Sequence, residues 1–117
     1  MSQVNFNTSA RLSGLQRFDC LAWVNFNGTG TVAIRASGNV SSITDNGTGD
    51  YTVNFTNPMP DANYAVTPCG DVASGATRNA PAPVNISTQT TSAVRLLTHD
   101  NLGAAVDFET VTAAAFR

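Results

Sequence analysis

Apolar and polar positions alternate one by one along much of the chain after residue 19, whereas the three-to-four-residue spacing of a helix is rare. The clearest case is segment 51–56, in which Tyr51, Val53 and Phe55 alternate with Thr and Asn. A period of two places the apolar side chains on one face of a strand. The pattern therefore predicts a β protein with Phe26, Val53 and Phe55 in its core.

Segment 20–26 differs because it is apolar on both faces. Alternate residues from Cys20 to Phe26 share one face, and Leu21 and Trp23 lie on the other. Such a strand has to be covered on both faces, by a second sheet or by a neighbouring subunit. We expect Trp23 to belong to the core rather than to form a platform for a sugar ring, because a single Trp within an apolar strand is usually packed.

Turn residues separate the expected strands. Asn27–Gly30 and Asp45–Gly49 combine Asn or Asp with Gly, which suits tight turns. Proline cannot donate to a strand ladder, so we expect 57–61 to end the strand before it and Pro68 to end the strand that begins at Tyr64. Further strands are expected at 32–34, 40–43, 84–87, 93–98 and 105–116, the last with Val106, Phe108, Thr110 and Thr112 on one face.

About eight short strands with regular turns are typical of a sandwich or a barrel. The length of 117 residues fits one domain. We therefore predict an all-β fold, a single-domain antiparallel β-sandwich or barrel-like domain at residues 20–117. Residues 1–19 are polar and weakly patterned, and we expect them to form a short N-terminal arm.

Charged residues make up only 12% of the chain and lysine is absent, whereas about 25% is usual. Thr, Asn and Ser are abundant in place of charged residues. They give a surface that can form hydrogen bonds but lacks the charges that usually keep a monomer soluble. Together with the adjacent Leu96 and Leu97, this composition favours a homo-oligomer, which we expect to be a trimer.

The same composition argues against two classes of partner. The net charge is −2 and the six Arg are scattered singly, so no nucleic acid is expected. No apolar run approaches the roughly 18 residues of a membrane span, so no membrane insertion is expected either. The first residues lack the basic and apolar segments of a signal peptide, and we expect assembly in a cytoplasm.

Residues that could carry chemistry are few. His99 is the only histidine, no G-x-S-x-G is present, and most Asp residues sit where they can cap a turn: Asp45, Asp50, Asp61 and Asp71. Segment 45–50 departs from a calcium loop because Gly stands at its third and fifth positions. We expect no enzyme, no catalytic residue, no cofactor and no metal site.

The two cysteines, Cys20 and Cys69, could form one disulfide, but their spacing fits no metal site. In a reducing cytoplasm two buried free thiols are the favoured interpretation.

Loops on a rigid sandwich are the usual place for binding groups. Segment 71–83 carries Arg78 and Asn79, and segment 99–101 brings together His99, Asp100 and Asn101. Planar polar side chains of this kind suit hydroxyl-rich glycans. These five residues are the candidate binding residues, and ordinary solvated loops are the alternative.

Two long segments carry a resemblance to a known family. They are AWVNFNGTGTVAIRAS at 22–37 and NVSSITDNGTGDYTVNF at 39–55, followed by MPDANY at 59–64 and the terminal AFR at 115–117. In these residues the chain resembles the C-terminal domain of phage and prophage tail-fibre proteins. The resemblance covers about 20–70 closely and the last dozen residues loosely, and it carries over no catalytic residues.

The resemblance implies a surface module of a bacteriophage virion that is usually trimeric and contacts other virion proteins. The leading expectation is a non-enzymatic, receptor-binding tail-fibre tip that recognises a host surface glycan. A tail fibre has a long shaft before this module, whereas about 19 residues precede it here. A capsid decoration protein whose arm grips the phage head is therefore an alternative, and a free carbohydrate-binding module is another.

Overall fold

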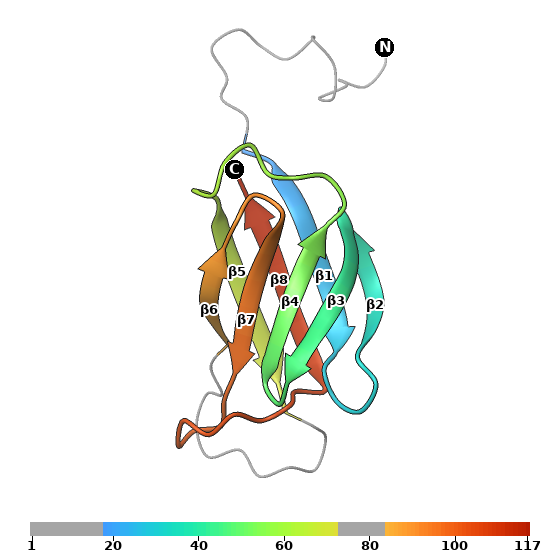
Figure 1. The fold of residues 1–117 in the computed structure, drawn as a ribbon, viewed down its shortest axis with the longest axis vertical. Coiled ribbons are helices and arrows are strands. Elements are labelled where there is room, and N and C mark those ends of the chain that lie inside the picture. The colour runs from blue at the N-terminus through green and yellow to red at the C-terminus, as the bar shows by residue number, and fades with distance from the viewer. Residues whose placement is uncertain (1–17, 73–83) are drawn as a thin grey trace, which may run out of the picture.

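The structure is a computed structural model that describes residues 18–72 and 84–117, and it is an antiparallel β-sandwich (Figure 1). Sheet A has the strand order β2-β1-β8-β5 and sheet B the order β3-β4-β7-β6. The strands are β1 (Cys20–Asn27), β2 (Ala33–Gly38), β3 (Val40–Gly47), β4 (Asp50–Phe55), β5 (Ala65–Asp71), β6 (Val84–Gln89), β7 (Ala93–Thr98) and β8 (Thr110–Phe116). The predicted all-β sandwich is confirmed.

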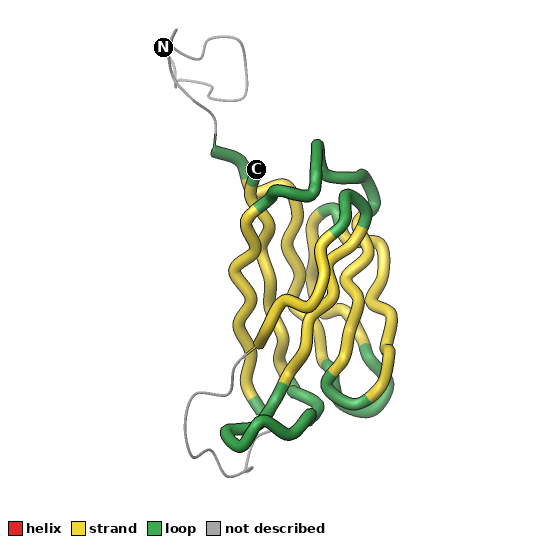
Figure 2. The backbone as a smooth tube through the Cα atoms, turned by 60° about the vertical axis from the view of Figure 1, so that its left-hand side comes forward, coloured by secondary structure: helices red, strands yellow, loops and turns green. Residues whose placement is uncertain are grey.

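The first and last strands lie side by side in the middle of sheet A, where Trp23 is paired with Ala114. Strand β1 therefore begins, and β8 ends, at one end of the sandwich, which we call the upper end (Figure 1). The β1–β2, β3–β4 and β7–β8 connections lie at the opposite, lower end. Figure 2 shows the two sheets as separate layers with these loops at their ends.

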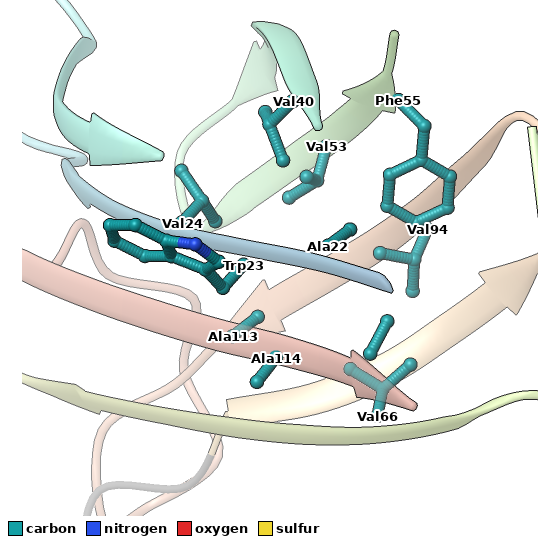
Figure 3. Close-up of a pocket in the computed structure, with 11 residues that line it drawn as sticks. Ala22, Trp23, Val24, Val40, Val53, Phe55, Val66, Val94, Ala113 and Ala114 are labelled. Carbon is teal, nitrogen blue, oxygen red and sulfur yellow. The ribbon is translucent and has the colours of Figure 1, made fainter. Parts of the chain in front are cut away.

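The core lies between the sheets and includes Phe26, Val53 and Phe55, as the alternation predicted. Phe26 of sheet A meets Tyr51 of sheet B edge to face, with ring centroids 5.2 Å apart. Figure 3 shows valines such as Val53 and Val94 of sheet B around the space between the layers. Only about 10 Å³ of that space can take the centre of a water molecule, room for no more than about one water molecule.

The predicted turns are present and their side chains explain why they form. Asn27 Oδ1 accepts hydrogen bonds from the amide and hydroxyl of Thr29, at 2.9 and 2.7 Å. Asp45 and Asp61 each accept the amide of the residue two positions later, as turn-forming Asp residues do. Asp50 differs, because its carboxylate is held by Arg95 across the sheet rather than by a turn amide.

Strand β3 runs to Gly47 rather than ending at Ile43, and three further strand predictions are wrong in a boundary or a face. Strand β5 continues through Pro68, which is possible because β5 is an edge strand and needs no donor on its outer side. Strand β8 begins only at Thr110 and buries Val111 with alternate residues after it, so Thr110 and Thr112 face outward. A register shift after Cys20 turns this residue away from the core face that Ala22 occupies.

Candidate functional site

The predicted binding loop at 99–101 lies at the lower end of the sandwich, between β7 and β8 (Figure 1). His99 forms an isolated bridge with Ala105, which closes the loop into a short hairpin. Asp100 shapes its tip, because Asp100 Oδ1 accepts the amides of Leu102 and Ala104 at 2.8 and 2.9 Å. The Asp100 carboxylate therefore serves the loop backbone, whereas Asn101 stays exposed.

Leu102 is the most exposed large apolar residue among those that the structure describes, at 87%. It lies between Asn101 and Gly103, whose φ of +86° makes the tight turn possible. Leu102 was not among the predicted binding residues, although an apolar residue beside a turn glycine was a signal in the sequence. At the start of the loop, His99 Nδ1 lies 3.5 Å from the side-chain amide nitrogen of Asn85 on β6. The loop thus offers an imidazole, an amide and an apolar tip.

A buried polar network holds the base of this loop. The Tyr51 hydroxyl lies 2.9 Å from both the Gly28 carbonyl oxygen and Asp107 Oδ1, which share its one proton. Asp107 Oδ1 also accepts the Gly49 amide at 2.8 Å. Burial, with help from the Asp107 carboxylate, raises the pKa of Tyr51 far above its ordinary value, so the hydroxyl stays a donor. Three lower-end connections are therefore tied to one another.

Arg78 and Asn79, the other predicted binding residues, lie outside the described residues. The structure therefore brings together three of the five candidates, His99, Asp100 and Asn101, in one loop. Of these three, Asp100 stabilises the loop itself, because its carboxylate accepts two backbone amides.

The outward face of sheet A is a second candidate surface. The register places its outward residues in rows across the strands: Ala65, Phe116 and Cys20 in the upper row, then Thr67, Ala114, Trp23 and Gly38, then Cys69, Thr112, Asn25 and Ala36. We call this surface the sheet A face. Trp23 is 44% exposed and Phe116 39%. The expectation that Trp23 belongs to the core is therefore wrong.

The indole of Trp23 lies against its cross-strand neighbour Gly38 on β2. A Cβ atom at Gly38 would overlap the indole, so only glycine leaves room for the ring in this position. Such cover of a strand glycine by an aromatic ring helps to fix strand register. The indole thus contacts Gly38 and still leaves 44% of the residue surface exposed.

The cysteines also lie on the sheet A face. Both are free and exposed, so the expectation of buried thiols is wrong, although they are unpaired as expected. Cys20 pairs with Phe116 on β8, and Cys69 pairs with Thr112 on the same strand, two rows away.

A groove of about 510 Å³ runs beside Trp23 over β8. Ala114 and Thr112 form its floor, Trp23 and Asn25 line one side, and β5 lines the other through Thr67, Pro68 and Cys69. We call this depression the β8 groove. Its floor is lowest at Ala114, a small side chain between Trp23 and Thr67 in the same row.

The outward face of sheet B, the sheet B face, has a different chemistry. Asn54 Nδ2 donates to Ser42 Oγ and Thr44 Oγ1 across the β3–β4 pair, at 3.1 and 2.9 Å. Arg95 binds Asp50 through two hydrogen bonds of 2.8 and 2.5 Å, and this pair lowers the pKa of Asp50. Leu97 and Ala93 are apolar, but each is partly buried beside these polar groups.

Residues 18–72 and 84–117 contain no group of three or more His, Cys, Asp or Glu placed to hold a metal ion. They also contain no helix that could cross a membrane. Searches against family models, curated proteins and solved structures found no match to this chain. The two surfaces themselves are therefore the basis for a functional assignment.

Proposed function

We propose that this protein is a non-enzymatic structural protein of a bacteriophage virion, of the tail-fibre tip or receptor-binding type, that works as a homo-oligomer, most simply a trimer. The observation that carries the proposal is the division of the sandwich into two exposed surfaces. The sheet A face offers apolar area for a protein neighbour, and the lower-end loop at 99–105 offers polar groups for a ligand.

The positions of the chain ends support a tip that points away from its anchor. The chain enters the sandwich at the upper end, next to the end of β8, where Arg117 binds Asp61 at 2.7 Å. The loop with His99 and Asn101 lies at the far end (Figure 1). A module attached through its N-terminal residues would therefore present this loop outward, toward a host surface glycan.

The carboxylates support a binding role over a catalytic one. Asp50 and Asp61 are held by arginines, Asp100 holds loop amides, and Asp107 holds Tyr51. A general acid or base has to reach a substrate atom. In these four residues the carboxylate is occupied by the protein itself.

An adsorption assay tests this proposal. The protein is added to host cells in competition with the phage, in the wild-type form and with His99→Ala, Asn101→Ala and the paired change Arg78→Ala and Asn79→Ala. We leave Asp100 intact, because its loss would deform the loop. Thr48→Ala, an exposed change in the lower-end β3–β4 turn, is the matched control.

The proposal predicts that wild-type protein and the Thr48 control compete for adsorption and that at least one loop variant does not, with unchanged melting. Equal adsorption by all variants would contradict the receptor-binding role. Binding to phage heads that is lost on deletion of residues 1–17, with no effect on adsorption, would instead assign the protein to capsid decoration.

A further inference from the structure

We propose that the sheet A face is the surface through which copies of this chain associate, with Trp23 of one copy packed into the β8 groove of the next. The proposal rests on the oligomer in the proposed function and names the contact that forms it. The partner is a second copy of the same chain, and no host molecule is involved in this contact.

The residue types on the sheet A face are those that proteins usually bury. Cys, Phe, Ala and Trp lie mostly inside folded domains. Here Cys20, Cys69, Trp23 and Phe116 are all exposed, and all project from the same sheet. An exposed apolar patch of this kind marks a contact with another macromolecule. Aromatic residues are also enriched at such contacts.

The shapes on this face are complementary to each other. The aromatic ridge formed by Trp23 lies over β1 and β2, whereas the groove lies over β8, on the β5 side of the sheet. Turning one copy to face another places the ridge of the first over the groove of the second. Because ridge and groove are different patches, a closed assembly needs each copy to give one Trp23 and receive one. A two-fold dimer and a trimer both meet this requirement.

The charges of sheet A fit the same arrangement. Its four strands contain two charged residues, Arg35 on edge strand β2 and Asp71 on edge strand β5. When β2 of one copy lies over β5 of the next, opposite charges meet at the margin and none enters the centre around Ala114. Depletion of charge at the centre is the pattern of protein interfaces.

The edges of sheet A are poorly suited to association by strand addition. Edge strand β5 carries Pro68, which lacks an amide donor. The pairing of edge strand β2 with β1 contains a register shift between Asn25 and Phe26. We therefore expect the copies to associate through the sheet A face rather than through its edges. Four strands about 4.8 Å apart and about seven residues long give a face of roughly 19 by 23 Å. The area of this face is roughly half of the 800 Å² or so that a standard interface buries per partner. We therefore expect a weak association that dilution can reverse.

The test compares two Ala→Arg changes at matched outward positions. Ala114→Arg fills the floor of the β8 groove, whereas Ala93→Arg lies on β7 of the sheet B face. Masses of the full-length proteins are measured by sedimentation over a range of concentrations, and circular dichroism checks that each variant is folded. Trp23→Ser is a second variant of the same face, useful if the arginine disturbs β8.

Wild type and Ala93→Arg are expected to reach a multiple of 12.2 kDa at the same concentration. Ala114→Arg and Trp23→Ser are expected to raise the dissociation constant by roughly tenfold or more, as loss of a central contact does. If wild type associates and neither sheet A variant weakens it, this surface is wrong while the oligomer stands. If wild type remains at 12.2 kDa at high concentration, both the surface and the oligomer are wrong, whatever the adsorption assay shows.

Two further outcomes would assign the face to another occupant and overturn the proposal. One is a 12.2 kDa protein whose Trp23 fluorescence changes when purified host lipopolysaccharide is added, which would indicate a glycan site. The other is a 12.2 kDa protein in which deletion of residues 1–17 exposes Trp23, which would indicate that the chain covers its own face.

Discussion

The two outward faces of this sandwich are built on the same architecture and differ in what their side chains do. On the sheet B face, Asn54 and Asn46 bond to hydroxyls of neighbouring strands, and Arg95 pairs with Asp50. On the sheet A face, Trp23 lies against Gly38 and remains 44% exposed. The first face satisfies its own polar groups in water, whereas the second leaves apolar area without cover.

This difference cannot arise from the fold, because both sheets have four antiparallel strands and both contribute to one core. Nor does it follow from charge, since the strands of each sheet carry only a few charged residues. It follows from the outward positions alone, which the core does not constrain. Such positions are therefore the most informative about what a β-sandwich binds.

The largest effect is expected from the interior that both sheets share. Phe26 is fully buried against Tyr51, whereas Phe116 lies on the sheet A face and is 39% exposed. Phe26→Ala should lower the free energy of unfolding by about 3 to 5 kcal/mol, because it leaves a cavity between the sheets. Phe116→Ala should lower the free energy of unfolding of the dissociated protein by much less. Chemical denaturation at fixed protein concentration measures both, and equal losses would mean that the inside and outside of sheet A are assigned wrongly.

A smaller loss is expected from Tyr51→Phe, which removes the hydroxyl that joins Gly28 and Asp107. Leaving a buried carbonyl without its donor costs about 1 to 3 kcal/mol. Tyr64→Phe is the control. The Tyr64 hydroxyl donates to the Thr90 and Ala93 carbonyls at 2.8 and 3.0 Å, but Thr90 is exposed to water and the Ala93 carbonyl keeps the Thr90 amide as a donor. Thermal melts compare the two variants. A larger loss for Tyr64→Phe would contradict the view that the lower-end network is the more demanding one.

The smallest effect is expected from the ion pairs. Arg95 lowers the pKa of Asp50, and Arg117 lowers the pKa of Asp61 to about 2. An unfolded Asp titrates near pH 3.9, so these pairs stabilise the fold above about pH 4 and lose that contribution as the pH falls toward about 2. Both pairs are partly exposed, and the Asp50 pair should contribute no more than about 1 kcal/mol. Asp50→Asn should reduce the loss between pH 5 and pH 2 measured by urea unfolding, and an unchanged profile would show that this pair contributes nothing.

Much of the fold could be predicted because alternation reports which residues face the core. Segment 51–56 and segment 20–26 each became a strand with the expected inner face, apart from Cys20. Pro68 was misjudged because whether a strand lies at an edge depends on distant pairings that a local pattern does not contain. The shift after Cys20 lies in the pairing of β1 with β8, and the start of β8 at Thr110 lies in its pairing with β5, so both depend on strands that are distant in the sequence.

The surfaces were harder to predict than the fold. Alternation did place Trp23 on the face opposite Val24, but the general tendency of Trp to be buried pointed to the core. The β8 groove could not be predicted, because it depends on three strands from distant parts of the sequence. The loop with His99 was located correctly. That Asp100 accepts the amides of Leu102 and Ala104 could not be predicted, because it depends on the backbone path of the loop.

The most direct test of the sheet A face uses Trp23 itself, which is the only tryptophan in the chain. Its fluorescence and its quenching by iodide therefore report the environment of this face alone. We predict that dilution of the wild-type protein through its dissociation range shifts the emission to longer wavelength and increases quenching, in step with the fall in mass toward 12.2 kDa. A fall in mass with no change in the emission or quenching of Trp23 would contradict the account.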